Sequence, residues 1–274
     1  MFEMERIIRT ALTEDIGSGD VTTMATIPVG TMARAELVAK EDFILAGLDV
    51  ARRTFLMLDP SLSFEGLRSD GDRIKRGEVI AWIKGEASTL LQGERVALNF
   101  LQRMSGIATL TSRFVAAVSG TQAMIVDTRK TIPGLRLLDK YSVRMGGGSN
   151  HRHSLYDGVL IKENHVAAAG GISAAIQRAR TQIPHTLKIE IETRNLDEVR
   201  EAMAAGADII MLDNMDLETM CRAVEVVAGK ALTEASGGVN LETVTAIAET
   251  GVNLISIGAL THSVKAADIS MLFQ

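Results

Sequence analysis

The last third of the chain repeats one pattern of polar and apolar residues three times. Each repeat opens with Asn or Asp followed by acidic residues, which is typical of a helix N-cap and suits the positive end of the helix dipole. Each repeat continues with apolar residues at helical spacing and ends at a glycine, which favours the left-handed position after a helix. The openings are NLDEV at 195–199, DLETM at 216–220 and NLETV at 240–244, and the closing residues are Gly206, Gly229 and Gly251. This pattern predicts three helices.

Short apolar runs that end in polar or small residues alternate with helical segments. The six runs are at 123–130, 157–164, 186–193, 207–214, 230–238 and 253–260. Because helices separate most of them, the runs predict the strands of parallel β–α units. A β/α barrel is the natural closure of such a sheet, although an open doubly wound sheet has the same pattern.

The first part of the chain has a different pattern. Partial alternation of apolar and polar residues at 34–47 and 77–86 predicts antiparallel strands, and helical periodicity at 93–120 predicts one long helix, bent near Ser105 and Gly106. We therefore expect two domains of α/β class, without a low-complexity linker between them. The first covers 1–115, with the C-terminal segment 262–274 packing back on it, and the second covers 116–261.

The composition excludes several classes of protein. Of the 274 residues, 46% are hydrophobic and 23% are charged, so the chain can build a core and is not expected to be disordered. The net charge of −5 argues against a nucleic-acid partner. The single cysteine cannot form an internal disulfide, which favours a cytoplasmic location. The sequence shows no secretory signal and no run of about eighteen apolar residues, so no membrane span is expected.

Polar side chains and glycines lie where the predicted strands end. In chain order these are Arg129 and Lys130, then Lys162, Glu192, Asp213, Ser236 with two glycines, and Gly258. In barrels and in open parallel sheets the carboxyl ends of the strands converge on one mouth. We therefore expect cations, carboxylates and glycine-rich turns to meet around one cavity.

Positive charge is concentrated in one segment. Residues 125–165 hold seven Lys or Arg against four Asp or Glu. Arginine suits bidentate binding of carboxylate or phosphate, and lysine supplies a mobile point charge. His151 and Arg152 directly follow GGGSN in a loop before a strand, which makes them candidates for this site. Arg136, Lys140 and Arg144 instead suit the solvated face of a helix.

The carboxylates Glu192 and Asp213 have two interpretations. As hard oxygen ligands at neighbouring strand ends they could hold Mg²⁺ beside a phosphate. They could equally pair with the nearby lysines. By strand alternation Glu190 points the same way as Glu192, one layer deeper, and is a candidate for a buried ion pair.

Glycine-rich turns follow the last two predicted strands, SGG at 236–238 and GAL at 258–260. They would expose backbone N–H groups where barrels often bind phosphate, with simple tight turns as the alternative. No GxGxxG or GxxxxGK[ST] motif is present, which disfavours Rossmann and P-loop folds. No zinc pattern appears. Cys221 and Trp82 are assigned to the core, and His165 to a ligand role or to a hydrogen bond at a helix start.

Several segments together resemble a known family. They are ALTEDIGSGDVTT (11–23), GERVALNFLQRMSGIATLT (93–111), DTRKTIPGLRLLDKYSVRMGGGSNHR (127–152), LIKENH (160–165), IEIE (189–192), MLDNM (211–215), EASGG (234–238) and GALTHSV (258–264). The chain resembles the quinolinate phosphoribosyltransferase family along almost its whole length, and DTRKT-PGLR with GGG-NHR is highly specific. The resemblance implies an N-terminal α/β sandwich and an open, TIM-like α/β barrel of seven strands. It also implies homodimers, or hexamers built from them, with active sites shared between subunits.

The resemblance also implies the role of each site residue. Quinolinate would contact Arg129, His151, Arg152, Lys162 and Arg95, the last entering the site of the neighbouring subunit. Phosphoribosyl pyrophosphate would contact Thr128, Lys130 and Lys162. Glu192 and Asp213 would lie beside the ribose hydroxyls and Mg²⁺, directly or indirectly. The 5′-phosphate would rest against Ser236, Gly237, Gly238, Ile257, Gly258 and Ala259. Lys130, Lys162, Glu192 and Asp213 form the expected catalytic set.

The implied reaction gives nicotinate mononucleotide, pyrophosphate and CO₂, a step of NAD biosynthesis. Two other classes compete with it. Lys162 ends an apolar strand, as the nucleophile of a Schiff-base barrel aldolase would, but an aldolase has no evident need for so many cations and glycine turns. A non-catalytic anion-binding homologue would bind phosphoribosyl pyrophosphate without turnover.

Overall fold

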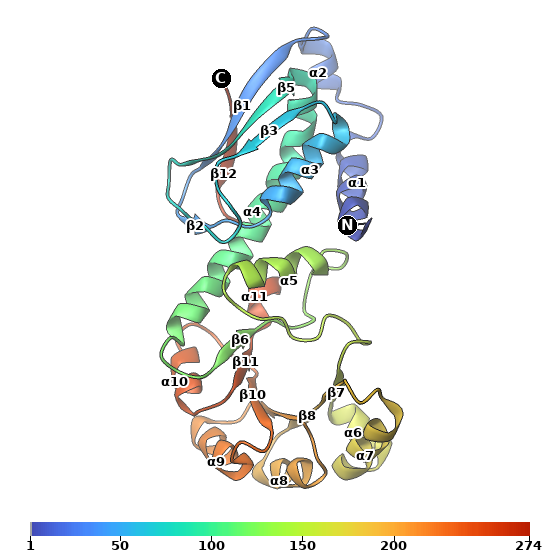
Figure 1. The fold of residues 1–274 in the computed structure, drawn as a ribbon, viewed down its shortest axis with the longest axis vertical. Coiled ribbons are helices and arrows are strands. Elements are labelled where there is room, and N and C mark those ends of the chain that lie inside the picture. Colours follow the sequence, from blue (N-terminus) through green and yellow to red (C-terminus); the bar gives the residue numbers. More distant parts are fainter. Residues whose placement is uncertain (1) are drawn as a thin grey trace. The chain divides into compact units, whose positions relative to one another are not determined.

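The computed structural model describes residues 2–274, and it divides the chain into two compact units. Of the described residues, unit 1 comprises 2–112, 131–147 and 261–274, and unit 2 comprises 113–130 and 148–260. Figure 1 shows the order of the elements. The expected boundaries placed 131–147 in the barrel domain, but this segment belongs to unit 1.

Unit 1 combines helices with a small antiparallel sheet. Its helices are α1 (Phe2–Ile16), α2 (Val21–Thr26), α3 (Leu48–Leu58), most of α4 (Ala87–Ala117) and α5 (Arg136–Met145). Its strands are β1 (Met32–Ala39), β2 (Phe43–Ile44), β3 (Ser63–Gly66), β4 (Arg73–Ile74), β5 (Val79–Glu86) and β12 (Ile269–Phe273). The main sheet has the order β12-β1-β5-β3 and is antiparallel. The strand predicted at 77–86 is confirmed as β5, whereas the segment predicted at 34–47 forms two strands, β1 and β2, in different sheets.

The core of unit 1 fills the space between this sheet and the helices. One buried cluster joins inward residues of the sheet to α3 through Phe55 and to α4 through Leu90 and Leu101. A second cluster joins α1, α3 and α4 to α5 through Leu138. In addition, Arg103 of α4 donates to the buried Asp139 of α5 at 2.8 and 3.0 Å. These contacts explain why α5 belongs to unit 1, although the segment interrupts the β–α repeat in sequence.

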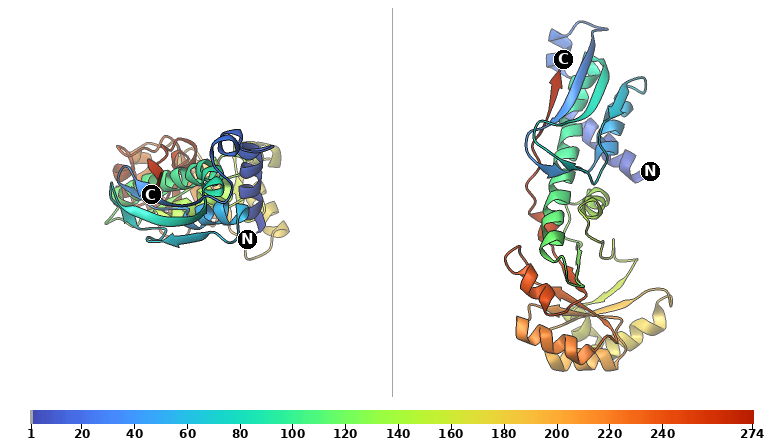
Figure 2. Two further views of the ribbon diagram at one scale, coloured as in Figure 1. Left: turned by 90° about the horizontal axis from the view of Figure 1, so that it is seen from above. Right: turned by 60° about the vertical axis from the view of Figure 1, so that its left-hand side comes forward.

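The C-terminal strand completes the sheet of unit 1. β12 pairs antiparallel with β1, with Leu37 opposite Met271, so the last residues of the chain lie beside one of the first strands (Figure 2). The chain reaches β12 by passing close to α4. A Cβ atom at Gly106 would lie 2.2 Å from the carbonyl oxygen of Lys265, so α4 needs a glycine at this point to let the segment pass.

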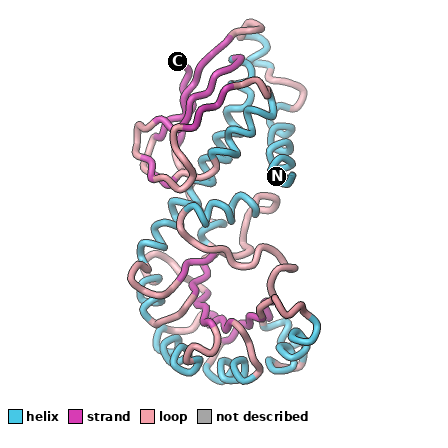
Figure 3. Tube along the Cα trace, viewed as in Figure 1, coloured by secondary structure: helices cyan, strands magenta, loops and turns pink. Residues whose placement is uncertain are grey.

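Unit 2 is a parallel sheet surrounded by helices on its outer side (Figure 3). Its strands are β6 (Met124–Val126), β7 (Val159–Ile161), β8 (Ile189–Thr193), β9 (Ile209–Asp213), β10 (Leu232–Ser236) and β11 (Leu254–Ser256). Its helices are α6 (Glu163–Ala169), α7 (Ile172–Gln182), α8 (Leu196–Ala204), α9 (Leu217–Val227) and α10 (Val244–Glu249), and α11 (Ala259–His262) follows β11. All six predicted strands are confirmed.

The sheet has the order β6-β11-β10-β9-β8-β7 and stays open, because β6 and β7 do not pair. The resemblance implied seven strands, whereas residues 2–274 form six in this sheet. On the free side of β6 there is a single parallel bridge, between Val126 and Ser149. The chain cannot extend this bridge, because the next two residues turn to bond Asp127, at the end of β6.

The predicted helix ends agree with the structure in most details. Asn195 caps α8 by accepting from the N–H groups of Asp197 and Glu198, and Asp216 caps α9 by accepting from that of Thr219. Gly206, Gly229 and Gly251 all have positive φ, between 74 and 86°. Asn240 differs, since it caps a turn at Glu242 and Thr243 and α10 starts only at Val244.

The side-chain pattern of α9 corrects one assignment. Its buried residues are Met220, Ala223 and Val227, whereas Cys221 is exposed. The pattern placed Cys221 in the core because it adjoins Met220, but the helix presents its neighbouring face to the sheet. Trp82 is only partly buried and stacks beneath the guanidinium of Arg34, 3.9 Å from the ring centre.

We predict that Gly106→Ala destabilises the protein. Alanine in place of glycine normally stabilises a helix interior by about 0.5–1 kcal/mol. Here the added methyl group would strike the Lys265 carbonyl, and forced overpacking costs about 1–3 kcal/mol. The unfolding midpoint in urea should therefore fall. Asn99→Ala, at an exposed position of the same helix, is the control and should leave the midpoint equal or higher; a Gly106→Ala variant with an unshifted midpoint would contradict the close approach.

Candidate active site

A buried carboxylate at the end of β6 fixes the loop that carries His151 and Arg152. Asp127 is fully buried. It accepts from the backbone N–H of His151 at 2.9 Å and from the side chain of Asn150 at 2.6 Å. Sequence reasoning assigned no role to Asp127, although an acidic residue directly after an apolar strand was the available signal.

Two arginines next to this loop have unsatisfied hydrogen-bond donors. Arg129 follows β6 and Arg152 follows His151, and the Nε atom of each is buried without a hydrogen-bond partner. One terminal nitrogen of Arg152 donates to the carbonyl of Gly158 at 3.0 Å. Burial, followed by the positive charge of Arg129, lowers the pKa of Arg152. Two interacting guanidinium groups with free donors form a site for an anion with carboxylate or phosphate geometry.

Lys162 lies between β7 and α6 and is ion-paired. Its Nζ is 3.0 Å from Oε2 of Glu192, at the end of the neighbouring strand β8. Its backbone N–H donates to Nδ1 of His165 at 3.0 Å. His165 therefore forms the helix-start hydrogen bond that was one of its two predicted roles. Of the two interpretations of Glu192, pairing with a lysine is the one that the structure displays.

Asp213 and the glycine turn after β10 are connected through Asn214. The side chain of Asn214 donates to Asp213 at 3.0 Å, and its backbone N–H donates to the carbonyl of Ser236 at 2.9 Å. Gly237 has a φ of +97°, and a Cβ atom there would lie 2.1 Å from Oδ1 of Asn214. Glycine is therefore required at 237, and the turn presents bare backbone.

The other predicted residues occupy the remaining loop ends. Thr128 accepts from the N–H of Lys130 at 3.0 Å, which shapes the turn after β6, and Lys130 is exposed. Ile257 is buried and donates its N–H to the carbonyl of Val126 at 3.0 Å, so β11 and β6 remain paired up to Gly258 and Ala259. In unit 1, Arg95 is exposed on α4.

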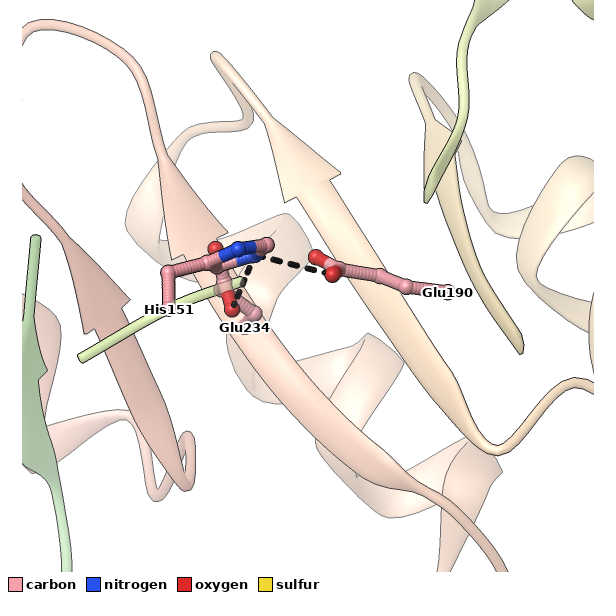
Figure 4. A group of neighbouring side chains, drawn as sticks. All are labelled: His151, Glu190 and Glu234. Atoms are coloured by element: carbon pink, nitrogen blue, oxygen red, sulfur yellow. Dashed lines mark ion pairs between the residues drawn. The ribbon is translucent and has the colours of Figure 1, made fainter. Parts of the chain in front are cut away.

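A histidine and two glutamates meet on the inner wall of the sheet (Figure 4). Nε2 of His151 is 2.9 Å from Oε2 of Glu190 on β8 and 3.7 Å from Oε2 of Glu234 on β10. Glu190 is buried, as the expectation required, and its partner is the imidazole of His151. Glu234 was missed, although it lies two residues before Ser236, as Glu190 does before Glu192. The same alternation rule could have found it.

A cavity of about 560 Å³ lies on the inner side of the sheet. Its lining includes His151, Arg152, Glu190 and Glu234 together with residues at the amino ends of the strands. The volume suits a small organic ligand. Lys162, Glu192 and Asp213, at the carboxyl ends, are not among the lining residues. The expected single cavity thus contains only part of the predicted set.

Contrary to the prediction, the lysine and arginine residues of α5 are not all exposed to solvent. Lys140 is 1% exposed within unit 1, so the assignment of this residue to a solvated face is wrong. Its helix, α5, buries Leu138 and Asp139 on the side that faces α1 and α4. Arg144 is exposed, and Arg136 is partly buried and donates to Thr131 at 3.0 Å.

Within residues 2–274, no helix has both the length and the apolar character that crossing a membrane requires.

Comparison with known proteins covers both units. The model of the quinolinate phosphoribosyl transferase N-terminal domain matches residues 20–105, and that of the C-terminal domain matches residues 107–272. The probable nicotinate-nucleotide pyrophosphorylase [carboxylating] of Bacillus subtilis is 46% identical over 269 residues, covering 98% of this chain and 93% of the relative. The chloroplastic nicotinate-nucleotide pyrophosphorylase [carboxylating] of Arabidopsis thaliana is 47% identical, covering 98% and 82%.

Solved structures give the same result. The crystal structure of NadC from Streptococcus pyogenes superposes with a TM-score of 0.96 at 42% identity, covering 100% of this chain and 97% of the other. The nicotinate-nucleotide pyrophosphorylase of Francisella tularensis superposes with a TM-score of 0.95 at 41% identity, covering 99% and 96%. With both domain models matched in order and such identity along nearly the whole chain, this protein belongs to the quinolinate phosphoribosyltransferase family.

Proposed function

We propose that this protein transfers the phosphoribosyl group of phosphoribosyl pyrophosphate to quinolinate with loss of CO₂. The products are nicotinate mononucleotide, pyrophosphate and CO₂, as required for NAD biosynthesis. The observation that carries the proposal is the pair Arg129 and Arg152, whose buried Nε donors have no hydrogen-bond partner. The pair suits a small dicarboxylate, and the relatives are named as enzymes of this reaction.

Quinolinate has two carboxylates on adjacent ring carbons, so its recognition needs several cations in a fixed arrangement. Arg129 and Arg152 supply bidentate donors, and His151 is fixed beside Arg152 by the Asp127 carboxylate. Lys162 supplies a further positive charge at the end of β7. Held in this way, the ring nitrogen is oriented toward C1 of the ribose, which lowers the entropic part of the barrier.

Phosphoribosyl pyrophosphate would bind at the carboxyl ends of the strands. Thr128 and Lys130 lie in the turn after β6 for the pyrophosphate, and Glu192 and Asp213 end β8 and β9 for the ribose hydroxyls. The 5′-phosphate would bind backbone N–H groups of two turns. These turns are formed by Ser236, Gly237 and Gly238, and by Ile257, Gly258 and Ala259.

Glu192 and Asp213, which are carboxylates at neighbouring strand ends, would hold Mg²⁺ as hard oxygen ligands. Asp213 accepts a hydrogen bond from the side chain of Asn214 at one of its oxygens, and the second oxygen of the carboxylate can serve as a ligand. Bound there, Mg²⁺ would neutralise charge on the departing pyrophosphate. Lys130, in the turn after β6, would also stabilise the negative charge on the departing pyrophosphate.

The reaction then proceeds in two stages. The ring nitrogen forms a bond to ribose C1 as the bond to pyrophosphate breaks, through a centre of oxocarbenium character. The ring is now cationic, so it can accept the electron pair released when the carbon–carbon bond to the adjacent carboxylate breaks. CO₂ leaves, and a proton takes its place on the ring carbon.

Neither competing class is favoured by an observation. The amine of Lys162 is half exposed and paired with Glu192, unlike the desolvated amine that a Schiff-base aldolase needs. A non-catalytic anion-binding role would not require the strand-end carboxylates in addition to the cations. We also propose a cytoplasmic protein without nucleic-acid or membrane partners, on the basis of its single cysteine and net charge of −5.

Release of CO₂ from quinolinate labelled at the 2-carboxylate tests the reaction. With Mg²⁺ present, we expect release only when phosphoribosyl pyrophosphate is added, in step with formation of nicotinate mononucleotide. Omission of each substrate is the control. A folded protein that binds phosphoribosyl pyrophosphate and releases no CO₂ would overturn the proposal.

Replacement of Arg152 tests the carboxylate site. In Arg152→Ala a buried charged partner of the substrate is lost, which costs about 3–4 kcal/mol, so kcat/KM for quinolinate should fall about 100- to 1,000-fold. Arg200→Ala removes an exposed arginine of α8 and should retain kcat/KM. Near-normal kcat/KM in Arg152→Ala would rule out this assignment.

We further propose a homodimer, or a hexamer built from three such dimers, in which Arg95 of one subunit completes the site of its partner. Arg95→Ala and Arg152→Ala should each be nearly inactive as pure proteins. If the site is shared, mixed dimers regain one site with both arginines, and activity returns after the two variants are unfolded and refolded together. Refolding each variant alone is the control, and no recovery in the mixture would place Arg95 outside the partner's site.

A further inference from the structure

The cluster of His151, Glu190 and Glu234 has more negative charge than its hydrogen bonds account for. The Glu234 side chain is completely buried and that of Glu190 is 5% exposed. One oxygen of Glu190 and both oxygens of Glu234 have no hydrogen-bond partner. Burying an ionised carboxylate without a donor is costly, so a positive charge or a proton must compensate for it.

The hydrogen bonds of His151 determine where its proton lies. The backbone N–H of Arg152 donates to Nδ1 of His151 at 2.7 Å, so Nδ1 acts as an acceptor. The proton of the neutral ring is then on Nε2, and it points to Glu190 at 2.9 Å. The Oε2 atom of Glu234 is 3.7 Å from the same nitrogen, so the N–H group of the histidine does not form a hydrogen bond with it.

A bound metal ion is the first alternative, because the three potential ligand atoms lie within 4.8 Å of one another. However, with its proton on Nε2 the histidine has no lone pair to offer from that nitrogen. Arg152, whose pKa is influenced by the charges of both Arg129 and Glu190, places cationic charge near the same cluster. A proton on Glu234 removes the uncompensated negative charge. It requires neither a lone pair on Nε2 of His151 nor a second cation beside Arg152.

We propose that Glu234 is a positioning residue that works as a neutral carboxylic acid and so preserves the positive charge of the arginine pair for a dianionic substrate. With Glu234 neutral, the negative charges that act on Arg152 are those of Glu190 and Asp157. Ionisation of Glu234 would add a further negative charge to the same wall and reduce its net positive charge before the substrate arrives. The proposal rests on the proposed function only for the identity of the dianion.

The surroundings of Glu234 support this protonation state. Burial, followed by the charge of Glu190, raises the pKa of Glu234 to about 7, against the smaller opposing effects of His151 and of the Ser256 hydroxyl. On the adjacent strand β11, the hydroxyl of Ser256 donates to the carbonyl of Ala235 at 3.4 Å. On β9 the residue in register is the uncharged Met211. Arg152, His153, Asp157 and Lys188 line the same cavity and complete the set of charged and titratable groups.

The proposal predicts a specific effect of pH. As the pH rises through about 7, Glu234 loses its proton and adds a negative charge beside the arginines. The KM for quinolinate should then rise, by up to about tenfold per pH unit, whereas kcat should change much less. A merely structural glutamate would not produce this difference between KM and kcat.

The test compares Glu234→Gln with the unaltered protein, between about pH 6 and pH 9. Glutamine imitates the neutral acid, so the variant should show the low-pH KM at every pH. Glu234→Met, also neutral and of similar length, should give the same flat profile if the glutamine variant fails to fold. Glu190→Gln is the matched control. In this variant the rise of KM with pH should remain but occur at lower pH, because the negative charge of Glu190, which favours the protonated form of Glu234, is lost.

An infrared measurement tests the proton without turnover. A carboxylic-acid carbonyl band should be present below pH 7, disappear above it, and be absent from Glu234→Gln. This band would be observed even if quinolinate were not the substrate, so failure of the proposed function and failure of this inference are distinguishable. A KM step that persists in Glu234→Gln, an absent band, or one equivalent of metal that Glu234→Gln fails to retain would overturn the inference.

Discussion

The hydrogen bonds of the buried Asp127 carboxylate determine the site of unit 2. Asp127 ends β6, and its two oxygens bond the side chain of Asn150 and the backbone of His151. These bonds turn the chain inward after the single bridge at Ser149. The sheet therefore stays open on this side, and the loop brings His151 and Arg152 to its inner wall.

The charges of that wall form one balanced set. The arginine pair retains donors without partners, which an anion can satisfy. Glu190 compensates for part of their charge and at the same time accepts from His151. Every group of this wall is at least partly removed from water. The gain or loss of one proton at Glu234 therefore changes the electrostatic potential at the arginines much more than it would at a surface. Binding of a dianion and the protonation of the wall are thus coupled.

The two ends of the sheet present different groups. The cavity toward the amino ends of the strands is lined by His151 and Arg152, but not by Arg129 or Lys162. The carboxyl ends present Lys162, Glu192, Asp213 and the bare backbone at Gly237, which suit ribose and phosphate. Asn214 connects two of these strand ends, and the lack of a side chain at Gly237 is what leaves room for it.

The sequence by itself determined the six parallel strands, the helix caps and most of the candidate residues, because periodicity, caps and strand ends depend on local order along the chain. It also determined the family, through motifs such as DTRK and GGGSNHR. Only the tertiary structure decided which side chains are buried and which charged groups lie beside one another. Lys140 and Cys221 were misassigned because burial depends on which face of a helix packs against other elements. Asp127 and Glu234 emerged only when distant strands were brought together, since the partners of a buried carboxylate come from other segments of the chain.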